Sequence, residues 1–207
     1  MFNERIEFDD MTEDTLLLAT IRMNTEFALI SVRCILNPQN GDIEVYGNRH
    51  IYYFFHLQSL LTSCGNITSA FFSPKPFSSI NPNTGRYDST IYRGIEDAAR
   101  RFRDNYGITK QRFDLIFNKE MRNTVIHSNE RIIEHNGHLG DFNIIYRNTP
   151  RAVIDELLGT PHLRTIDLRN MNYHSYDRRQ SPIMINLYDL EQQLTELQNA
   201  MGRAFEQ

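Results

Sequence analysis

An arginine and a histidine lie five positions apart in the segment Arg122-Asn123-Thr124-Val125-Ile126-His127. Arginine binds a phosphate with a planar fork of donors and keeps its charge at physiological pH. Histidine takes up or releases a proton near neutral pH. A fixed positive charge close to a proton-transferring group suits chemistry on a phosphodiester, so Arg122 and His127 are the first candidates for catalysis.

The expected setting of this motif is an amphipathic helix. At about 100° per residue, Arg122 and His127 would point roughly 140° apart. Asn123 lies four positions before His127 and shares its face, and Arg131 continues this polar stripe. Arg122 and His127 can therefore meet at one phosphate only if Arg122 curls along the helix, or if a second copy brings its own set across a cleft. The second arrangement implies a homodimer through the motif helix.

Apolar residues recur at helical spacing along most of the chain, which predicts a mainly α-helical, up-and-down bundle. The expected helices cover residues 12–36, from 42 or 44 to about 72, 89–106, 109–135 and from 187 onward. Thr12 and Thr109 are the expected N-caps of the first and fourth of these helices. Residues 74–89 contain several Pro, Ser and Asn and are predicted to form a long loop.

After Gly140, the long helical repeats give way to short β-prone segments. Residues 142–146, 163–168 and 182–186 are short and rich in β-branched or aromatic side chains. They predict a small, partly β, hairpin-like element over 141–186, placed before the C-terminal helix. With 207 residues and 40% hydrophobic composition, the chain is expected to form a single domain over 1–207.

The N-terminus is acidic and lacks the basic start and apolar centre of a signal peptide. No apolar run in the sequence approaches about 18 residues, the length that a membrane span needs. The sequence therefore predicts a soluble, cytoplasmic protein that binds no membrane. Cys34 and Cys64 both fall in apolar helical segments, where free buried thiols are the expected state.

Charge is unevenly distributed along the chain. The formal net charge is −4, but residues 93–131 hold nine Lys or Arg against six Asp or Glu, which gives this stretch +3 and leaves −7 for the remainder. A solvated helix face is the ordinary reading of such asymmetry, and a local phosphate-binding surface is the alternative. Lys119 and Arg131 flank the motif within this basic stretch and are the candidates for binding a substrate.

The order Arg122-Asn123, three residues, His127 resembles the signature of HEPN domains (higher eukaryotes and prokaryotes nucleotide-binding). The flanking text Asp104-Asn105-Tyr106-Gly107-Ile108 and Asn129-Glu130-Arg131-Ile132 is similar to that of a bacterial branch of this superfamily. The resemblance implies a metal-independent endoribonuclease without cofactor, whose two protomers line a shared cleft. It further implies a toxin or phage-defence setting, with RNA as substrate and an antitoxin or other protein as partner.

By the same resemblance, His127 would act as general base or acid on the ribose 2′-hydroxyl or the leaving 5′-oxygen. Arg122 would neutralise the phosphate in the transition state, and Asn123 would orient the histidine or contact the substrate backbone. The alternative is a noncatalytic HEPN-like module that binds a nucleotide or a protein. In that case Arg122 pairs with an acid, and Asn123 and His127 form hydrogen bonds across an interface.

Other constellations are weaker. His127, His135 and His138 suggest a metal site, but no cysteine or carboxylate pair completes a ligand set, so no metal is expected. The aromatic run over 52–55 could stack bases but is more typical of a core or interface. The remaining histidines, among them His174, are isolated in the sequence and are expected to be exposed or hydrogen-bonded.

Overall fold

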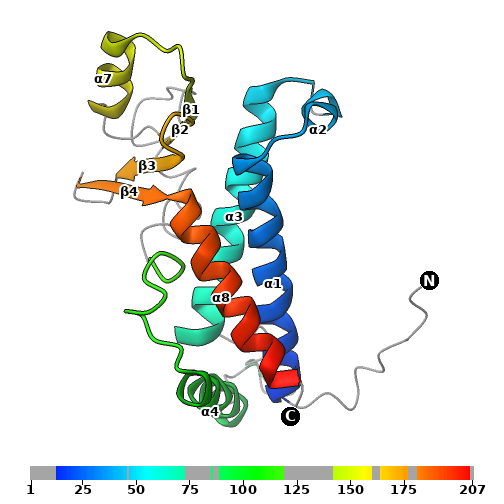
Figure 1. The fold of residues 1–207 in the computed structure, drawn as a ribbon. Coiled ribbons are helices and arrows are strands. Elements are labelled where there is room, and N and C mark those ends of the chain that lie inside the picture. Colours follow the sequence, from blue (N-terminus) through cyan, green and yellow to red (C-terminus); the bar gives the residue numbers. More distant parts are fainter. Residues whose placement is uncertain are drawn as a thin grey trace.

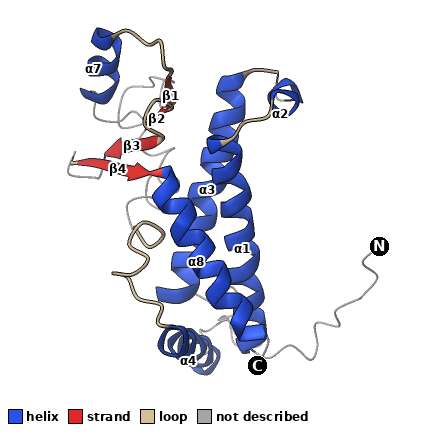
Figure 2. Cartoon of the chain, viewed as in Figure 1, coloured by secondary structure: helices blue, strands red, loops and turns tan. Residues whose placement is uncertain are grey.

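The computed structural model describes residues 13–45, 47–72, 85, 89–118, 142–159, 164–176 and 181–205. Three long helices, α1 (Glu13–Leu36), α3 (Arg49–Phe72) and α8 (Leu187–Phe205), lie side by side, with α1 packed against both of the others (Figure 1). Helix α4 (Ser89–Tyr106) packs against α1 and α3 at one end of this bundle. A small sheet lies at the other end, and helices dominate the chain (Figure 2).

The expected helix from residue 42 or 44 to about 72 is wrong as a single element. The chain forms α2 (Asn40–Val45), turns, and then begins α3. Gly47 has a φ of 73°, a left-handed conformation that residues with a Cβ rarely adopt. The Asn48 side-chain oxygen accepts a hydrogen bond from the Ile51 N–H at 2.8 Å and so caps α3. The glycine therefore ends one helix, and the asparagine starts the next.

The core fills the space between α1, α3 and α8, where apolar side chains at helical spacing face one another. Its fully buried members on these helices include Ile21, Val32, Ile35, Leu57, Leu60, Ile67, Leu190, Leu194 and Leu197. The predicted free thiols are confirmed, and Cys34 is half-buried while Cys64 is buried. Burial raises the pKa of Cys64 to about 12, so this thiol is unreactive at neutral pH.

The predicted helix over 89–106 is confirmed as α4, and Gly107 follows it with a φ of 60°. Thr109 caps the next segment as expected, because its side-chain oxygen accepts the Arg112 N–H at 3.1 Å. The predicted helix from Thr109 is wrong for residues 110–117, which form successive turns, although the Phe113 and Phe117 N–H groups keep hydrogen bonds of helical spacing. The Leu115 N–H donates to the Gln193 side chain of α8 at 3.1 Å, so a tertiary bond replaces a helical one.

The sheet is larger than the predicted hairpin-like element. Its order is β1 (Phe142–Ile145), β2 (Arg164–Asp167), β3 (Asn172–Tyr176) and β4 (Pro182–Asn186). Strands β1 and β2 are parallel, and the other two pairs are antiparallel. The sequence predicted β1, β2 and β4 but missed β3, and it also missed the helix α7 (Arg151–Gly159) that connects β1 to β2.

The two faces of the sheet differ in chemistry. Ile144, Ile166, Tyr173 and Ile185 form one row across the four strands, and all are buried in the main core. Because side chains alternate along a strand, the neighbouring rows point to the opposite face. That face carries mainly polar residues, which are Asn143, Thr165, Asp167, Asn172, His174 and Asn186. The sheet thus uses its apolar face to dock on the helices.

Among the described residues, one helix, α1 over Asp14–Leu36, is long and apolar enough to cross a membrane by length and composition alone, and it lies near the N-terminus. Half of that window is buried inside the protein, where it packs against α3 and α8. The core helix of a soluble protein shows the same combination, and this finding is consistent with the predicted soluble state.

Candidate functional site

The motif residues Arg122, Asn123 and His127, and the flanking Lys119 and Arg131, lie in the segment 119–141, outside the described residues. The structure does describe both ends of that segment, Asn118 and β1. The elements that hold these two ends therefore define where the motif segment begins and ends.

The upstream end is fixed by an aromatic cluster, defined as Phe71, Phe72, Phe113 and Phe117. The Phe117 ring lies 5.8 Å from Phe71, 4.7 Å from Phe72 and 6.0 Å from Phe113, each in an edge-to-face arrangement. Such geometry adds to the stabilisation from burial. Next to Phe117, the Ile116 carbonyl accepts the Thr68 hydroxyl at 3.1 Å. The chain thus enters the motif segment from a rigid point beside the C-terminal part of α3.

The downstream end is fixed to the first half of the same helix. Strand β1 pairs with β2, and in β2 the Arg164 guanidinium donates to the Gln58 side chain at 3.3 Å. It also lies 5.7 Å from the Phe54 ring centroid. Gln58 and Thr68 are ten positions apart on α3, which corresponds to roughly 15 Å of helix. The motif segment therefore leaves and rejoins the fold along one side of α3.

Two cations gather at the upstream end. The Arg103 guanidinium lies 5.2 Å and the Lys110 ammonium 4.8 Å from the centre of the Phe72 ring. Arg103 also donates to the Phe71 carbonyl. Among the described residues, neither cation has a carboxylate within ion-pair distance, and we call this group the Phe72 cationic cluster. It leaves two positive charges beside the start of the motif segment, where a phosphate could neutralise them.

Arg112, by contrast, has a structural role. Its guanidinium pairs with Glu196 of α8, with Nε 2.9 Å from the carboxylate, and donates to the carbonyls of Tyr106 and Gly107 at 3.2 and 3.1 Å. It thus ties the end of α4 to α8. Within the described residues, some positive charges of the basic stretch are therefore neutralised by structural ion pairs, and Arg103 and Lys110 have no carboxylate partner.

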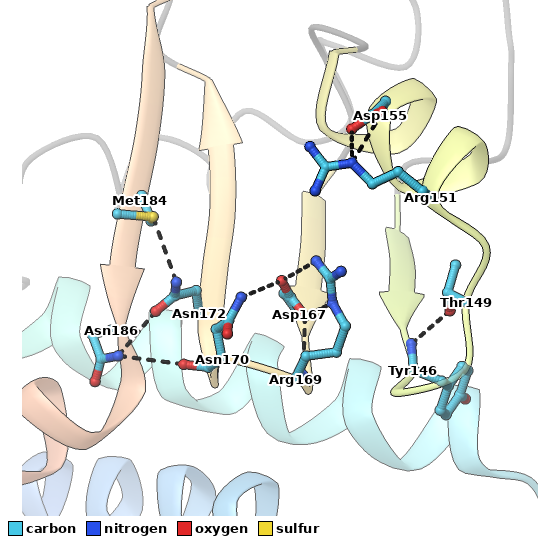
Figure 3. A network of polar contacts seen from close by, with 10 residues as sticks. All are labelled: Tyr146, Thr149, Arg151, Asp155, Asp167, Arg169, Asn170, Asn172, Met184 and Asn186. Atoms are coloured by element: carbon cyan, nitrogen blue, oxygen red, sulfur yellow. Dashed lines mark hydrogen bonds and ion pairs between the residues drawn. The ribbon is translucent and has the colours of Figure 1, made fainter.

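A second polar cluster lies at one end of the sheet, where Figure 3 shows the side chains of the β2–β3 turn and of β4 gathered together. Asp167 is 1% exposed and accepts from Arg169 Nε at 2.8 Å, Arg169 Nη2 at 2.6 Å and Asn170 Nδ2 at 3.1 Å. The Arg169 backbone N–H donates to the same carboxylate at 3.0 Å. This carboxylate organises the tight turn, in which Met171 has a φ of 51°.

The pKa of Asp167 reflects two opposing effects. Burial raises it, but the hydrogen bonds and positive charge of Arg169, with the Asn170 hydrogen bond, outweigh burial and leave the pKa below its usual range. A depressed carboxyl pKa means that folding favours the charged form. Asp167 therefore stabilises the fold above the unfolded-state pKa of about 3.9, and this contribution disappears as the pH falls through the lower folded-state pKa.

Replacing Asp167 by Ala is expected to lower the free energy of unfolding by about 2 kcal/mol at pH 7, because it removes the acceptor of four hydrogen bonds and leaves Arg169 unpaired. Urea unfolding followed by circular dichroism measures this change. Asp155→Ala is the matched control, since Asp155 pairs with Arg151 on the surface and should contribute less than about 0.5 kcal/mol. Equal losses for the two variants, or a difference that does not decrease as the pH falls below the unfolded-state pKa of about 3.9, would contradict the assignment.

His174 lies opposite Thr165 in the β2–β3 pair, on the polar face of the sheet. The His174 Nε2 atom and the Thr165 hydroxyl are both buried, and neither has a hydrogen-bond partner among the residues that the structure describes. Burial lowers the pKa of His174, Asp167 opposes this effect, and Arg169 adds to it, so the imidazole is neutral at pH 7. The prediction that His174 is exposed or hydrogen-bonded is wrong for its Nε2 atom.

The sheet cluster is suited to structure more than to chemistry. Asp167 and Arg169 satisfy each other, and no group of three or more His, Cys, Asp or Glu that could hold a metal occurs in the part of the chain that the structure describes. His127, His135 and His138 lie outside those residues. In the sequence, the only indication of this cluster is the spacing of Asp167 and Arg169 at the end of a β-prone run. The pairing of β2 with β3 shows that these two residues form a tight turn.

The aromatic run over 52–55 divides between core and surface. Tyr52 and Tyr53 are buried as expected, and the Tyr52 hydroxyl donates to the Cys34 carbonyl at 2.9 Å. Phe54 and Phe55 are 39% and 51% exposed, so they do not belong to the core, and the expectation of a core or interface run is confirmed only for the core position of the two tyrosines. Their side of α3 faces away from the interior that α1 and α3 share.

Comparison with protein-family models, with curated proteins and with solved structures found no match to this chain. The resemblance to HEPN domains therefore rests on the motif and its flanks, over residues 104–132.

Proposed function

We propose that this protein is a metal-independent endoribonuclease of the HEPN type, acting at a cleft between two protomers. The observation that carries the proposal is the placement of Arg122, Asn123 and His127 within one hexapeptide. These side chains supply a fixed positive charge, an amide that can position a neighbour, and a proton-transfer group. The same order and spacing recur at Arg169, Asn170 and His174, but there Arg169 is paired with Asp167 and His174 lies in strand β3.

Two features of the described fold support the proposal. The chain is mostly helical, which is compatible with the resemblance, and it has a small sheet before the last helix where the β-prone segments predicted one. The Phe72 cationic cluster also places Arg103 and Lys110 beside the point where the motif segment begins, without carboxylate partners among the described residues. Unpaired cations next to an aromatic ring suit a nucleic-acid backbone and its bases.

The proposed reaction needs only groups on the chain and the RNA itself. His127 takes the proton of a ribose 2′-hydroxyl, and the 2′-oxygen attacks the adjacent phosphorus. The bond to the 5′-oxygen then breaks, and the leaving oxygen receives a proton from a histidinium. Arg122 neutralises the charge that builds on the phosphate, while Lys119 and Arg131 hold the backbone. The products are a 2′,3′-cyclic phosphate and a free 5′-hydroxyl.

The alternative is a noncatalytic module that binds a nucleotide or a protein, such as an antitoxin. A specific observation favours it: several large apolar side chains of α1 are half exposed, which is typical of a surface that contacts protein. A phage-defence or toxin setting is compatible with either activity, because both kinds of protein work with partners.

Incubation of the purified protein with single-stranded RNA in excess chelator distinguishes the nuclease from the noncatalytic binding module. The matched substrate is DNA of the same sequence, which lacks the 2′-hydroxyl. We expect the RNA to be cut, the DNA to remain intact, and the RNA products to carry 2′,3′-cyclic phosphate ends, identified by mass spectrometry. Intact RNA, or cleavage that requires an added divalent metal, would reject the nuclease proposal and leave the binding module.

A further inference from the structure

Helix α1 presents a stripe of large apolar side chains to the surface. Leu16, Met23, Phe27 and Ile30 are 52%, 51%, 50% and 57% exposed. Thr20 and Cys34, both half-buried, complete a series with alternating spacings of four and three residues. We call these six positions the α1 seam. Alternating spacings of four and three are the repeat by which one helix packs along another in a coiled coil.

The seam points away from the rest of the molecule. At about 100° per residue, its four exposed members fall within roughly 60° of the helix circumference. The opposite side of α1 carries Ile21 and Val32, which are fully buried. One flank joins α3 through the hydrogen bond from Asn66 to Asn24 at 3.0 Å, and the other joins α8 through Arg33 and Glu191 at 2.8 Å. Within the described residues, α1 therefore has packing neighbours on every side except the seam.

The polar groups of the seam and its borders are already satisfied. The Thr20 hydroxyl donates to the Leu16 carbonyl at 2.9 Å, which leaves its methyl group for packing. Along one border, Arg22 pairs with Glu26 at 3.1 Å, and Arg33 pairs with Glu191. The positive and negative charges along this border therefore cancel. Two identical copies can therefore approach without like charges facing each other, which would otherwise oppose self-association.

The area is close to what a stable dimer needs. A large apolar side chain that is half exposed offers about 100 Å², so the four exposed seam residues offer about 400 Å². Ile51 and Phe55, both 51% exposed, extend this surface from α3, beside the Tyr52–Cys34 hydrogen bond at the end of the seam. The total of about 600 Å² compares with about 800 Å² per partner in a standard interface, and the bordering residues can supply the rest.

We propose that the α1 seam is an isologous interface with a second copy of this chain, in which two α1 helices pack on each other across a two-fold axis. The seam lies on the opposite side of α1 from the core against which residues 109–117 pack. It is therefore distinct from the surface at which the motif segment begins, after Asn118. The seam alone gives a dimer, and a second two-fold interface at the motif helix would close a tetramer if the two axes intersect at right angles.

The test uses the full chain and size-exclusion chromatography with light scattering over a range of concentrations. The variant Met23→Glu/Phe27→Glu puts charges into the seam at positions that are exposed in the protomer, so circular dichroism should show an unchanged fold. We expect this variant to have half the mass of the wild type. The matched control Val153→Glu/Met184→Glu replaces apolar residues that are 40% and 65% exposed elsewhere, and it should keep the wild-type mass.

A wild type that is monomeric at every concentration, or a seam variant that keeps the wild-type mass, would overturn the proposal. Wild-type protein that pellets with phosphatidylcholine vesicles as a monomer would also overturn it and would assign the seam to lipid. The result is independent of the proposed nuclease, because His127→Ala should keep the wild-type mass while the seam variant keeps its RNA cleavage. Loss of cleavage and loss of assembly are thus separate failures.

Discussion

Replacing His127 by Ala is expected to lower RNA cleavage by about 10²–10⁴-fold, the range over which a positioned general acid or base contributes. The loss should fall on kcat, since an imidazole that transfers a proton acts mainly in the transition state. Initial rates with a short fluorescent RNA in chelator measure it. The matched control is His135→Ala, the same substitution eight positions further along, and it should leave the rate within about twofold of wild type, well short of that loss.

Arg122 should respond differently from His127. Arg122→Lys keeps a positive charge but loses the planar fork, so we expect it to retain a small part of the activity that Arg122→Ala loses. A histidine variant with wild-type rate would show that another group transfers the proton. Equal cleavage by all of these variants would remove the motif from the mechanism and would leave the binding module as the function.

The expected helical geometry also predicts that two inactive variants can complement each other. If Arg122 and His127 point roughly 140° apart, one productive cleft takes its arginine from one protomer and its histidine from the other. Mixing the inactive Arg122→Ala and His127→Ala proteins, after unfolding and refolding them together, should then restore part of the activity. Mixtures that stay as inactive as the separate proteins would show that each protomer uses its own pair.

Much of the fold could be predicted from the sequence, because most of its helices combine a helical repeat with a clear end. Helix α1 ends just before Asn37-Pro38, α4 ends before Gly107, and α8 keeps an apolar repeat throughout. The break at Gly47 was missed because a single glycine costs a helix only about 1 kcal/mol. Its effect depends on the Asn48 cap of the next helix, which favours a restart after the turn.

The elements that could not be predicted depend on partners distant in the sequence. Residues 109–117 have an apolar helical repeat, but the Leu115 N–H donates to the Gln193 side chain of α8. Strand β3 is mostly polar, and only its pairing with β2 and β4 defines it. The α1 seam was hidden for the opposite reason. Its apolar residues look like core in the sequence, and only the placement of α3 and α8 shows that they remain outside.

The motif itself was accessible to sequence analysis because its chemistry depends on residue types and spacing within one segment. What holds that segment was not accessible. The aromatic cluster at its upstream end joins Phe113 and Phe117 to Phe71 and Phe72, which lie roughly forty residues earlier in the chain. No local sequence pattern specifies a contact across such a distance. This cluster ties the stability of the bundle to the position of the motif.

Replacing Phe113 by Ala is therefore expected to have a large effect on stability and a secondary effect on function. The Phe113 ring is fully buried, contacts Phe117 and lies 5.0 Å from the Arg112 guanidinium. Its removal should lower the free energy of unfolding by about 3–5 kcal/mol, as for other buried aromatic side chains. Urea unfolding measures this loss. Tyr188→Ala, at a ring that is 53% exposed, is the control and should lose far less.

The same variant tests whether the aromatic cluster positions the motif. At a temperature where Phe113→Ala is still folded, a loosened anchor should lower the RNA cleavage rate while the motif residues are intact. Phe113→Leu refills most of the cavity and should restore most of the stability and of the rate, because packing volume contributes more than the edge-to-face contact. A variant that is strongly destabilised yet cleaves RNA as fast as the wild type would show that the motif segment is held by contacts other than this cluster.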